Sequence, residues 1–142
     1  MSLDSGLYTI RNGEDLVGRA LYETLDLSPK AVFNKTDDPD ALWVVEVLPN
    51  GRYKLYAKGA PTAVENNMPA GPVVALLIQQ QDAEEWELAA VDQAAGTYQV
   101  RSSLGSVWLV PEPGKHGPIE TLPVPGDDTG SPTVFTFEKV DL

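Results

Sequence analysis

Apolar and polar residues alternate in three short stretches that share one pattern of glycine, tyrosine and an aliphatic residue. The pattern Gly-x-Tyr-x-aliphatic occupies residues 6–10, 51–55 and 96–100, and its tyrosines are spaced 45 residues apart. Side chains of a β-strand alternate between its two faces, so the tyrosine and the aliphatic residue of each stretch share one face. A repeat of fixed length indicates copies of one structural unit. We therefore expect three copies of one β unit.

A second pattern lies between these stretches. An aromatic residue is followed two positions later by another apolar residue at 43–47, 86–91 and 135–140. Glycines and prolines break the rest of the chain into short strands, which we expect near 6–11, 15–21, 30–34, 42–48, 51–57, 61–65, 73–80, 86–91, 96–102, 106–111, 119–124 and 133–140. Twelve strands in three units predict an all-β fold, the β-trefoil, since a propeller needs at least four blades.

The expected trefoil is a single domain over residues 1–142, with repeats at about 1–48, 49–92 and 93–142. Its last strand ends where it can pair with the first. A chain of 142 residues can bury a core of its own, and we expect a monomer.

The composition fits a reducing compartment. It contains no cysteine, so it has no disulfide framework. Its apolar runs fall short of the roughly 18 residues that a membrane helix needs. The opening residues MSLDSG lack the basic region and apolar core of a signal peptide. We therefore expect a cytoplasmic protein.

The net charge of the chain limits the kinds of partner that it can bind. The formal net charge is −11 at pH 7. Binding to nucleic acids, anionic membranes and heparin-like ligands depends on clustered lysine and arginine. The charge therefore argues against all three.

Catalytic chemistry finds little support. The single histidine, His116, lies in the loop 111–118, and no nucleophile elbow accompanies it. The acidic clusters 37–40 and 127–128 lack EF-hand spacing, and no phosphate-binding motif occurs. We expect neither an enzyme nor a cofactor or metal.

Proline-rich loops are the remaining candidates. Proline occurs in the segments 26–30, 66–72, 111–118 and 123–128. It narrows the unbound ensemble, so a loop that contains it loses less entropy on docking. Such loops suit a protein that inserts a rigid segment into a protease cleft, although proline also ends strands.

The opening of the chain has a distinctive pattern, Ser-Leu-x-x-Gly-x-Tyr-x-Ile-x-Asn, at Ser2, Leu3, Gly6, Tyr8, Ile10 and Asn12. Arg19, Leu21, Pro29 and Lys30 follow, and then the run 58–63 and the run 75–78. In these residues the chain resembles the mushroom β-trefoil serine protease inhibitors. The resemblance implies reversible, substrate-like inhibition of trypsin-type proteases by one exposed loop, in fungal defence.

The same resemblance implies where the inhibitory loop lies. In one family member it joins the second and third strands, and the residue before a Pro-Lys pair enters the protease's primary pocket. The matching position here is Ser28, in the segment Asp26, Leu27, Ser28, Pro29 and Lys30. In another member the loop corresponds to about 125–132, which here contains no lysine or arginine.

The residues themselves leave several pocket residues open. The primary pocket of trypsin carries an aspartate and binds lysine or arginine, and Lys30 and Lys115 lie at or near loops. The alternative inhibitory loop is therefore Gly114, Lys115 and His116. Leu27 would suit a protease with an apolar pocket. The target we expect is a trypsin-like serine protease.

Two further alternatives stay open. The mycocypins, fungal cysteine protease inhibitors, have a similar opening, and the loops that they use correspond to 11–15, 34–40 and 57–61. A β-trefoil lectin would use a Gln-x-Trp motif, which this chain lacks.

Overall fold

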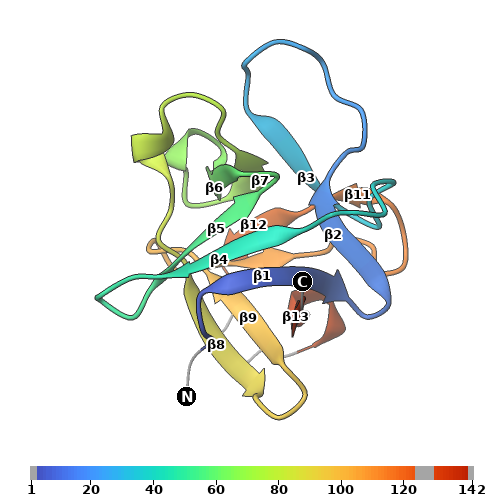
Figure 1. The fold of residues 1–142 in the computed structure, drawn as a ribbon. Helices are drawn as coiled ribbons and strands as arrows, with labels where there is room; N and C mark the ends of the chain where they lie inside the picture. The colour runs from blue at the N-terminus through green and yellow to red at the C-terminus, as the bar shows by residue number, and fades with distance from the viewer. Residues whose placement is uncertain (1–2, 124–129, 141–142) are drawn as a thin grey trace.

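The computed structural model describes residues 3–123 and 130–140, which form an all-β closed barrel with little helix (Figure 1). Its strands are β1 (Gly6–Asn12), β2 (Asp15–Arg19), β3 (Lys30–Asn34), β4 (Trp43–Val47), β5 (Tyr53–Ala57), β6 (Ala60–Val64), β7 (Gly71–Ala75), β8 (Glu87–Asp92), β9 (Thr97–Arg101), β10 (Ser106–Leu109), β11 (Gly117–Pro118), β12 (Glu120–Pro123) and β13 (Phe135–Lys139). Three short 3-10 turns complete it: η1 (Glu65–Asn67), η2 (Gln80–Asp82) and η3 (Ser131–Thr133).

The sheet closes through the first strand. Its order is β11-β3-β2-β1-β13-β9-β10-β12-β7-β6-β5-β4, and β4, at one end of the order, also pairs with β1, which closes the strands from β1 to β4 into a ring. β1 pairs with β13 as well, with Ile10 opposite Phe137. The predicted pairing of the last strand with the first is therefore confirmed.

The repeated tyrosines occupy equivalent places in β1, β5 and β9. Tyr8, Tyr53 and Tyr98 are all buried. Two of their hydroxyls bond to the opening segment: Tyr8 donates to the carbonyl of Asp4, and Tyr53 accepts from the N–H of Leu3. The repeat in the sequence thus corresponds to a repeat in the core.

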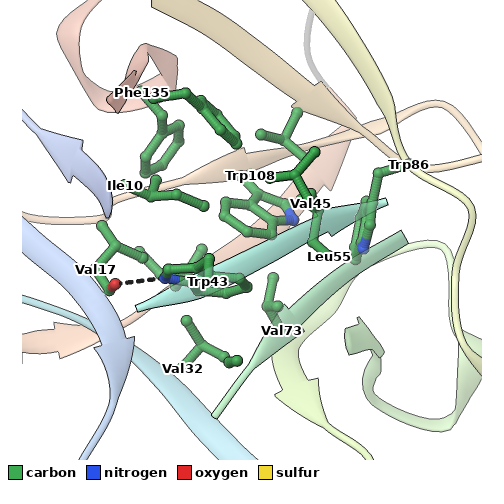
Figure 2. Packing of buried hydrophobic residues seen from close by; sticks show 14 of the residues in the cluster. Ile10, Val17, Val32, Trp43, Val45, Leu55, Val73, Trp86, Trp108 and Phe135 are labelled. Atoms are coloured by element: carbon green, nitrogen blue, oxygen red, sulfur yellow. Dashed lines mark hydrogen bonds between the residues drawn. The ribbon is translucent and has the colours of Figure 1, made fainter. Parts of the chain in front are cut away.

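Three tryptophans fill the barrel. Trp43, Trp86 and Trp108 are fully buried, and Trp108 packs against the other two and against Phe135 at ring-centroid separations of 5.5–5.7 Å (Figure 2). Trp43 Nε1 donates to the carbonyl of Val17 in β2 at 2.8 Å. This bond ties the barrel to the strand that leads into the candidate loop.

The strand count and the end of one strand differ from expectation. The described residues form a sheet of 13 strands, where twelve were expected. The additional strand, β11, is a Gly-Pro pair that adds to the edge of β3, and a two-residue strand leaves no alternating pattern to read. The strand expected near 73–80 is β7, which ends at Ala75, and Gln79 then adopts a left-handed conformation with φ 54°.

Within the described ranges, no helix is long and apolar enough to span a bilayer.

Candidate functional site

The β2–β3 loop, residues 20–29, extends away from the barrel at the top of Figure 1. Its apolar side chains face solvent: Leu25 is 100% exposed, Tyr22 85% and Leu27 59%. No backbone-to-backbone hydrogen bond involves residues 20–29 within the described part of the chain. Apart from Ala20 O, Leu21 N–H and Thr24 O, which bond to side chains, the peptide groups of this loop are therefore available to a partner.

The start of the loop is anchored by an arginine. Arg19 is buried, and its guanidinium bonds both carboxylate oxygens of Glu23, at 2.6 and 3.0 Å, and donates to the carbonyl of Ala57 at 3.1 Å. This two-point geometry holds Glu23 in a fixed orientation. Neighbouring loops add two bonds: Lys58 Nζ to Ala20 O at 2.8 Å, and Leu21 N–H to Asp37 Oδ1 at 2.9 Å.

The end of the loop is anchored by a lysine. Lys30 is 5% exposed, and its ammonium donates to Thr24 O at 3.0 Å, Thr24 Oγ1 at 2.9 Å and Asp26 Oδ1 at 2.7 Å. An ammonium has three donors, so all of them are used inside the loop. The Thr24 hydroxyl donates in turn to Asp26 Oδ1 at 2.7 Å. We call Lys30, Thr24 and Asp26 the lysine clamp.

The clamp corrects one expectation from the sequence. Lys30 was a candidate for a protease's primary pocket, but its side chain points into the loop and is buried. It would have to leave three hydrogen bonds to reach an enzyme. Asp26, Leu27, Ser28 and Pro29, the other members of the predicted segment, are all exposed.

The most exposed apolar residue was missed. Leu25 lies one position before the predicted segment 26–30 and follows Thr24. A leucine between two polar residues, Thr24 and Asp26, in a loop that ends in proline is a signal that could have identified it. Its exposure became evident only from the structure.

The lysine clamp lowers the pKa of the Asp26 carboxyl group. Its hydrogen bonds with Lys30, then Thr24 and Ser28, lower the pKa of the Asp26 carboxyl from 3.8 to about 2. A lowered pKa means that the bonds to the carboxylate are complete above pH 3.8 and are lost as the pH falls through about 2. An NMR titration of the carboxyl carbon should find this pKa in the wild type and a higher value in Lys30→Met, which loses the largest cause of the lowered pKa and keeps Thr24 and Ser28.

Asp38 is the internal control of that titration. The N–H of Asp40 and the ammonium of Lys58 lower its pKa, and neither belongs to the clamp. It should titrate identically in both proteins. A wild-type Asp26 that titrates near 4 would contradict the clamp.

The alternative loop at Lys115 is a closed turn. Glu112 O accepts from Lys115 N–H at 3.1 Å, and Gly114 has φ +86°. With proline at position 113, this is the geometry of a type II turn. The Lys115 side chain is exposed and lies 3.4 Å from a carboxylate oxygen of Glu112.

The backbone of this turn is bonded to strand β3. Asn34, which is fully buried, donates from Nδ2 to Lys115 O at 3.1 Å, and Lys35 Nζ donates to Gly114 O at 3.3 Å. His116 stacks on Phe33 with a centroid separation of 4.9 Å. The carbonyl of Lys115 therefore points at the protein, whereas substrate-like binding requires it to face the oxyanion hole of the enzyme. The structure brings Gly114, Lys115 and His116 together in a form that does not resemble a bound substrate.

The remaining candidate segments have other roles or lie outside the description. The turn 57–61 has positive φ at Lys58 and Gly59, and in the loop 34–40 Asp37 and Asp38 bond to Leu21 and Lys58. Most of 125–132, and the acidic pair 127–128, lie outside the described residues. Within the described ranges, no group of three or more His, Asp or Glu side chains is arranged to hold a metal.

Known proteins resemble this chain in sequence and fold. The family model described as peptidase inhibitor I66 matches residues 1–138. A protein of Lentinula edodes named serine protease inhibitor is 36% identical over 115 residues, which cover 78% of this chain and 77% of the relative.

Among solved structures, a proteinase inhibitor from Coprinopsis cinerea has a TM-score of 0.81 and 26% identity, over 98% of this chain and 100% of that one. A designed 3-fold symmetric protein, ThreeFoil, has a TM-score of 0.73 at 19% identity, over 95% of this chain and 99% of that one, and shares the fold. The chain therefore belongs to the peptidase inhibitor I66 family, so the predicted membership of a mushroom serine protease inhibitor family is confirmed and the chain is an inhibitor, not an enzyme.

Proposed function

We propose that the chain inhibits serine proteases reversibly, by placing the β2–β3 loop in the active-site cleft as a substrate would. One observation carries the proposal: the exposed backbone of residues 25–28 makes no hydrogen bond within the described part of the chain, and side chains anchor both ends of the loop. A protease can pair with such a backbone as with an added strand. The anchors reduce the entropy lost on binding. The names of the Lentinula and Coprinopsis relatives support the same activity.

The loop itself supports a target with an apolar primary pocket in place of the trypsin type first expected. Its exposed large side chains are Leu21, Tyr22, Leu25 and Leu27, and its lysine is enclosed. Trypsin-type inhibition would instead depend on Lys115, whose turn would first have to open. We also propose that the barrel is a β-trefoil. The equivalent, buried tyrosines of β1, β5 and β9 support this fold.

Amide hydrogen exchange of the protease complex tests the loop assignment. Wild-type protein is first assayed against chymotrypsin, subtilisin, trypsin and papain, and exchange is then measured free and bound to the serine protease that it inhibits most strongly. We expect slower exchange at residues 21–28 and unchanged exchange at 111–116, with one inhibitor bound per enzyme. Lys115→Ala should inhibit that enzyme as the wild type does.

Two outcomes would refute the proposal. Protection confined to 111–116 would move the site to the Lys115 turn. Inhibition of papain alone would favour the cysteine protease alternative.

A further inference from the structure

We propose that Leu25–Asp26 is the reactive peptide bond of the β2–β3 loop, that Leu25 fills the apolar primary pocket of a chymotrypsin- or subtilisin-type protease, and that Lys30 holds Thr24 and Asp26, the residues before and after Leu25. This inference rests on the proposed function and names its bond, its positioning residue and its target class.

Leu25 is the most exposed large apolar residue of the loop. Its side chain is 100% exposed, and no hydrogen bond to its backbone occurs within the described part of the chain. A pocket residue needs both properties, because its side chain must enter the enzyme and its carbonyl must reach the oxyanion hole. The primary pocket of chymotrypsin is an apolar slot, which suits a leucine and would leave a charged side chain unpaired.

Thr24 and Asp26, the residues before and after Leu25, are both hydrogen-bonded to the ammonium nitrogen of Lys30. Lys30 Nζ donates to Thr24 O at 3.0 Å and to Asp26 Oδ1 at 2.7 Å, so a single ammonium bridges the residue before Leu25 and the residue after it. Tyr22 is also exposed, but its neighbours Leu21 and Glu23 bond to different side chains, Asp37 and Arg19. The single bridge singles out the Leu25–Asp26 bond.

The bridge has a chemical consequence. The protease serine attacks the carbonyl carbon of Leu25, the C–N bond to Asp26 breaks, and the new α-amine of Asp26 takes the proton that the protease histidine removed from the serine. Lys30 keeps this amine beside the acyl-enzyme ester, because Thr24 and Asp26 remain on the same ammonium. The amine can then attack the ester, return its proton through the histidine to the serine, and restore the peptide bond. Hydrolysis by water would need the amine to move away first.

Four variants test the pocket residue and the clamp. Leu25→Ala should weaken inhibition of chymotrypsin by roughly 30- to 700-fold, the range of an interface hot spot, whereas Leu27→Ala should change it less than about threefold. Lys30→Met should inhibit at first and then lose inhibition over time, as the enzyme cleaves the chain between residues 25 and 26. Lys30→Arg keeps a charge and several donors and should restore part of the lifetime.

Mass spectrometry distinguishes a positioning role from a merely structural one. Wild-type protein cleaved at the 25–26 bond should regain intact mass on incubation with a trace of enzyme, and cleaved Lys30→Met should not. If Lys30→Met does not fold, as judged by circular dichroism, Leu25→Ala still tests the bond, because an exposed side chain does not support the barrel.

Three results would overturn the inference: cleavage at another bond, an unchanged inhibition constant in Leu25→Ala, or equal religation in wild type and Lys30→Met. Each leaves exchange protection of the loop intact, so these failures are distinct from a failure of the proposed function.

Discussion

Replacing Leu25 with lysine is expected to turn the protein into a strong inhibitor of trypsin. The new ammonium would reach the aspartate at the base of the trypsin pocket, while the clamp and the Arg19–Glu23 pair would still hold the loop. A desolvated, hydrogen-bonded charge pair at an interface changes affinity by about 2–5 kcal/mol, or roughly 30- to 4000-fold. Inhibition constants for trypsin and chymotrypsin, measured on both proteins, should move in opposite directions.

The matched control carries the same charge two residues further on. Leu27→Lys also places lysine at an exposed leucine of the β2–β3 loop, but outside the bridged bond, so it should leave trypsin inhibition almost unchanged. A gain in Leu27→Lys without one in Leu25→Lys would assign the pocket to residue 27. Introducing both changes on a Lys115→Ala background removes any contribution of the other loop.

Replacing Trp43 with alanine is expected to destabilise the barrel by about 5 kcal/mol. Deleting a buried aromatic side chain costs about 3–5 kcal/mol, and the carbonyl of Val17 loses its bond from Trp43 Nε1. This is a large share of the 5–15 kcal/mol that stabilises a typical domain. Urea unfolding followed by circular dichroism gives the free energy of unfolding.

Val44 provides the comparison on the same strand. It follows Trp43 in β4 but faces solvent and is 42% exposed, so Val44→Ala should cost less than about 1 kcal/mol. Equal losses of unfolding free energy in the two variants would mean that the packing of the three tryptophans does not stabilise the core.

The strands were predictable because their core residues alternate. Tyr8, Tyr53 and Tyr98 follow a fixed spacing, and each lies in a strand with its ring buried. The 3-10 turn and the left-handed Gln79 after β7 were missed, since the run Ala75 to Ile78 is apolar and reads as a longer strand.

The surroundings of the two candidate lysines were predicted less well, for a different reason. Lysine is almost never buried without partners, so Lys30 was read as a free cation, although Thr24 and Asp26 stand just before it in the sequence. The closed turn at Lys115 had a local signal, because Pro113-Gly114 favours a type II turn. Its inward carbonyl did not, since Asn34 lies far away in the chain.

The separation of the anchors from the exposed tip has a consequence for how such a protein can evolve. Leu25 is fully exposed and Leu27 is more than half exposed, so exchanging them should shift the free energy of unfolding by no more than about 0.5 kcal/mol. Arg19 and Lys30 would meanwhile keep the loop in the same shape. A lineage can therefore meet a protease of new specificity through one codon change, without crossing the stability threshold that limits substitutions in a core.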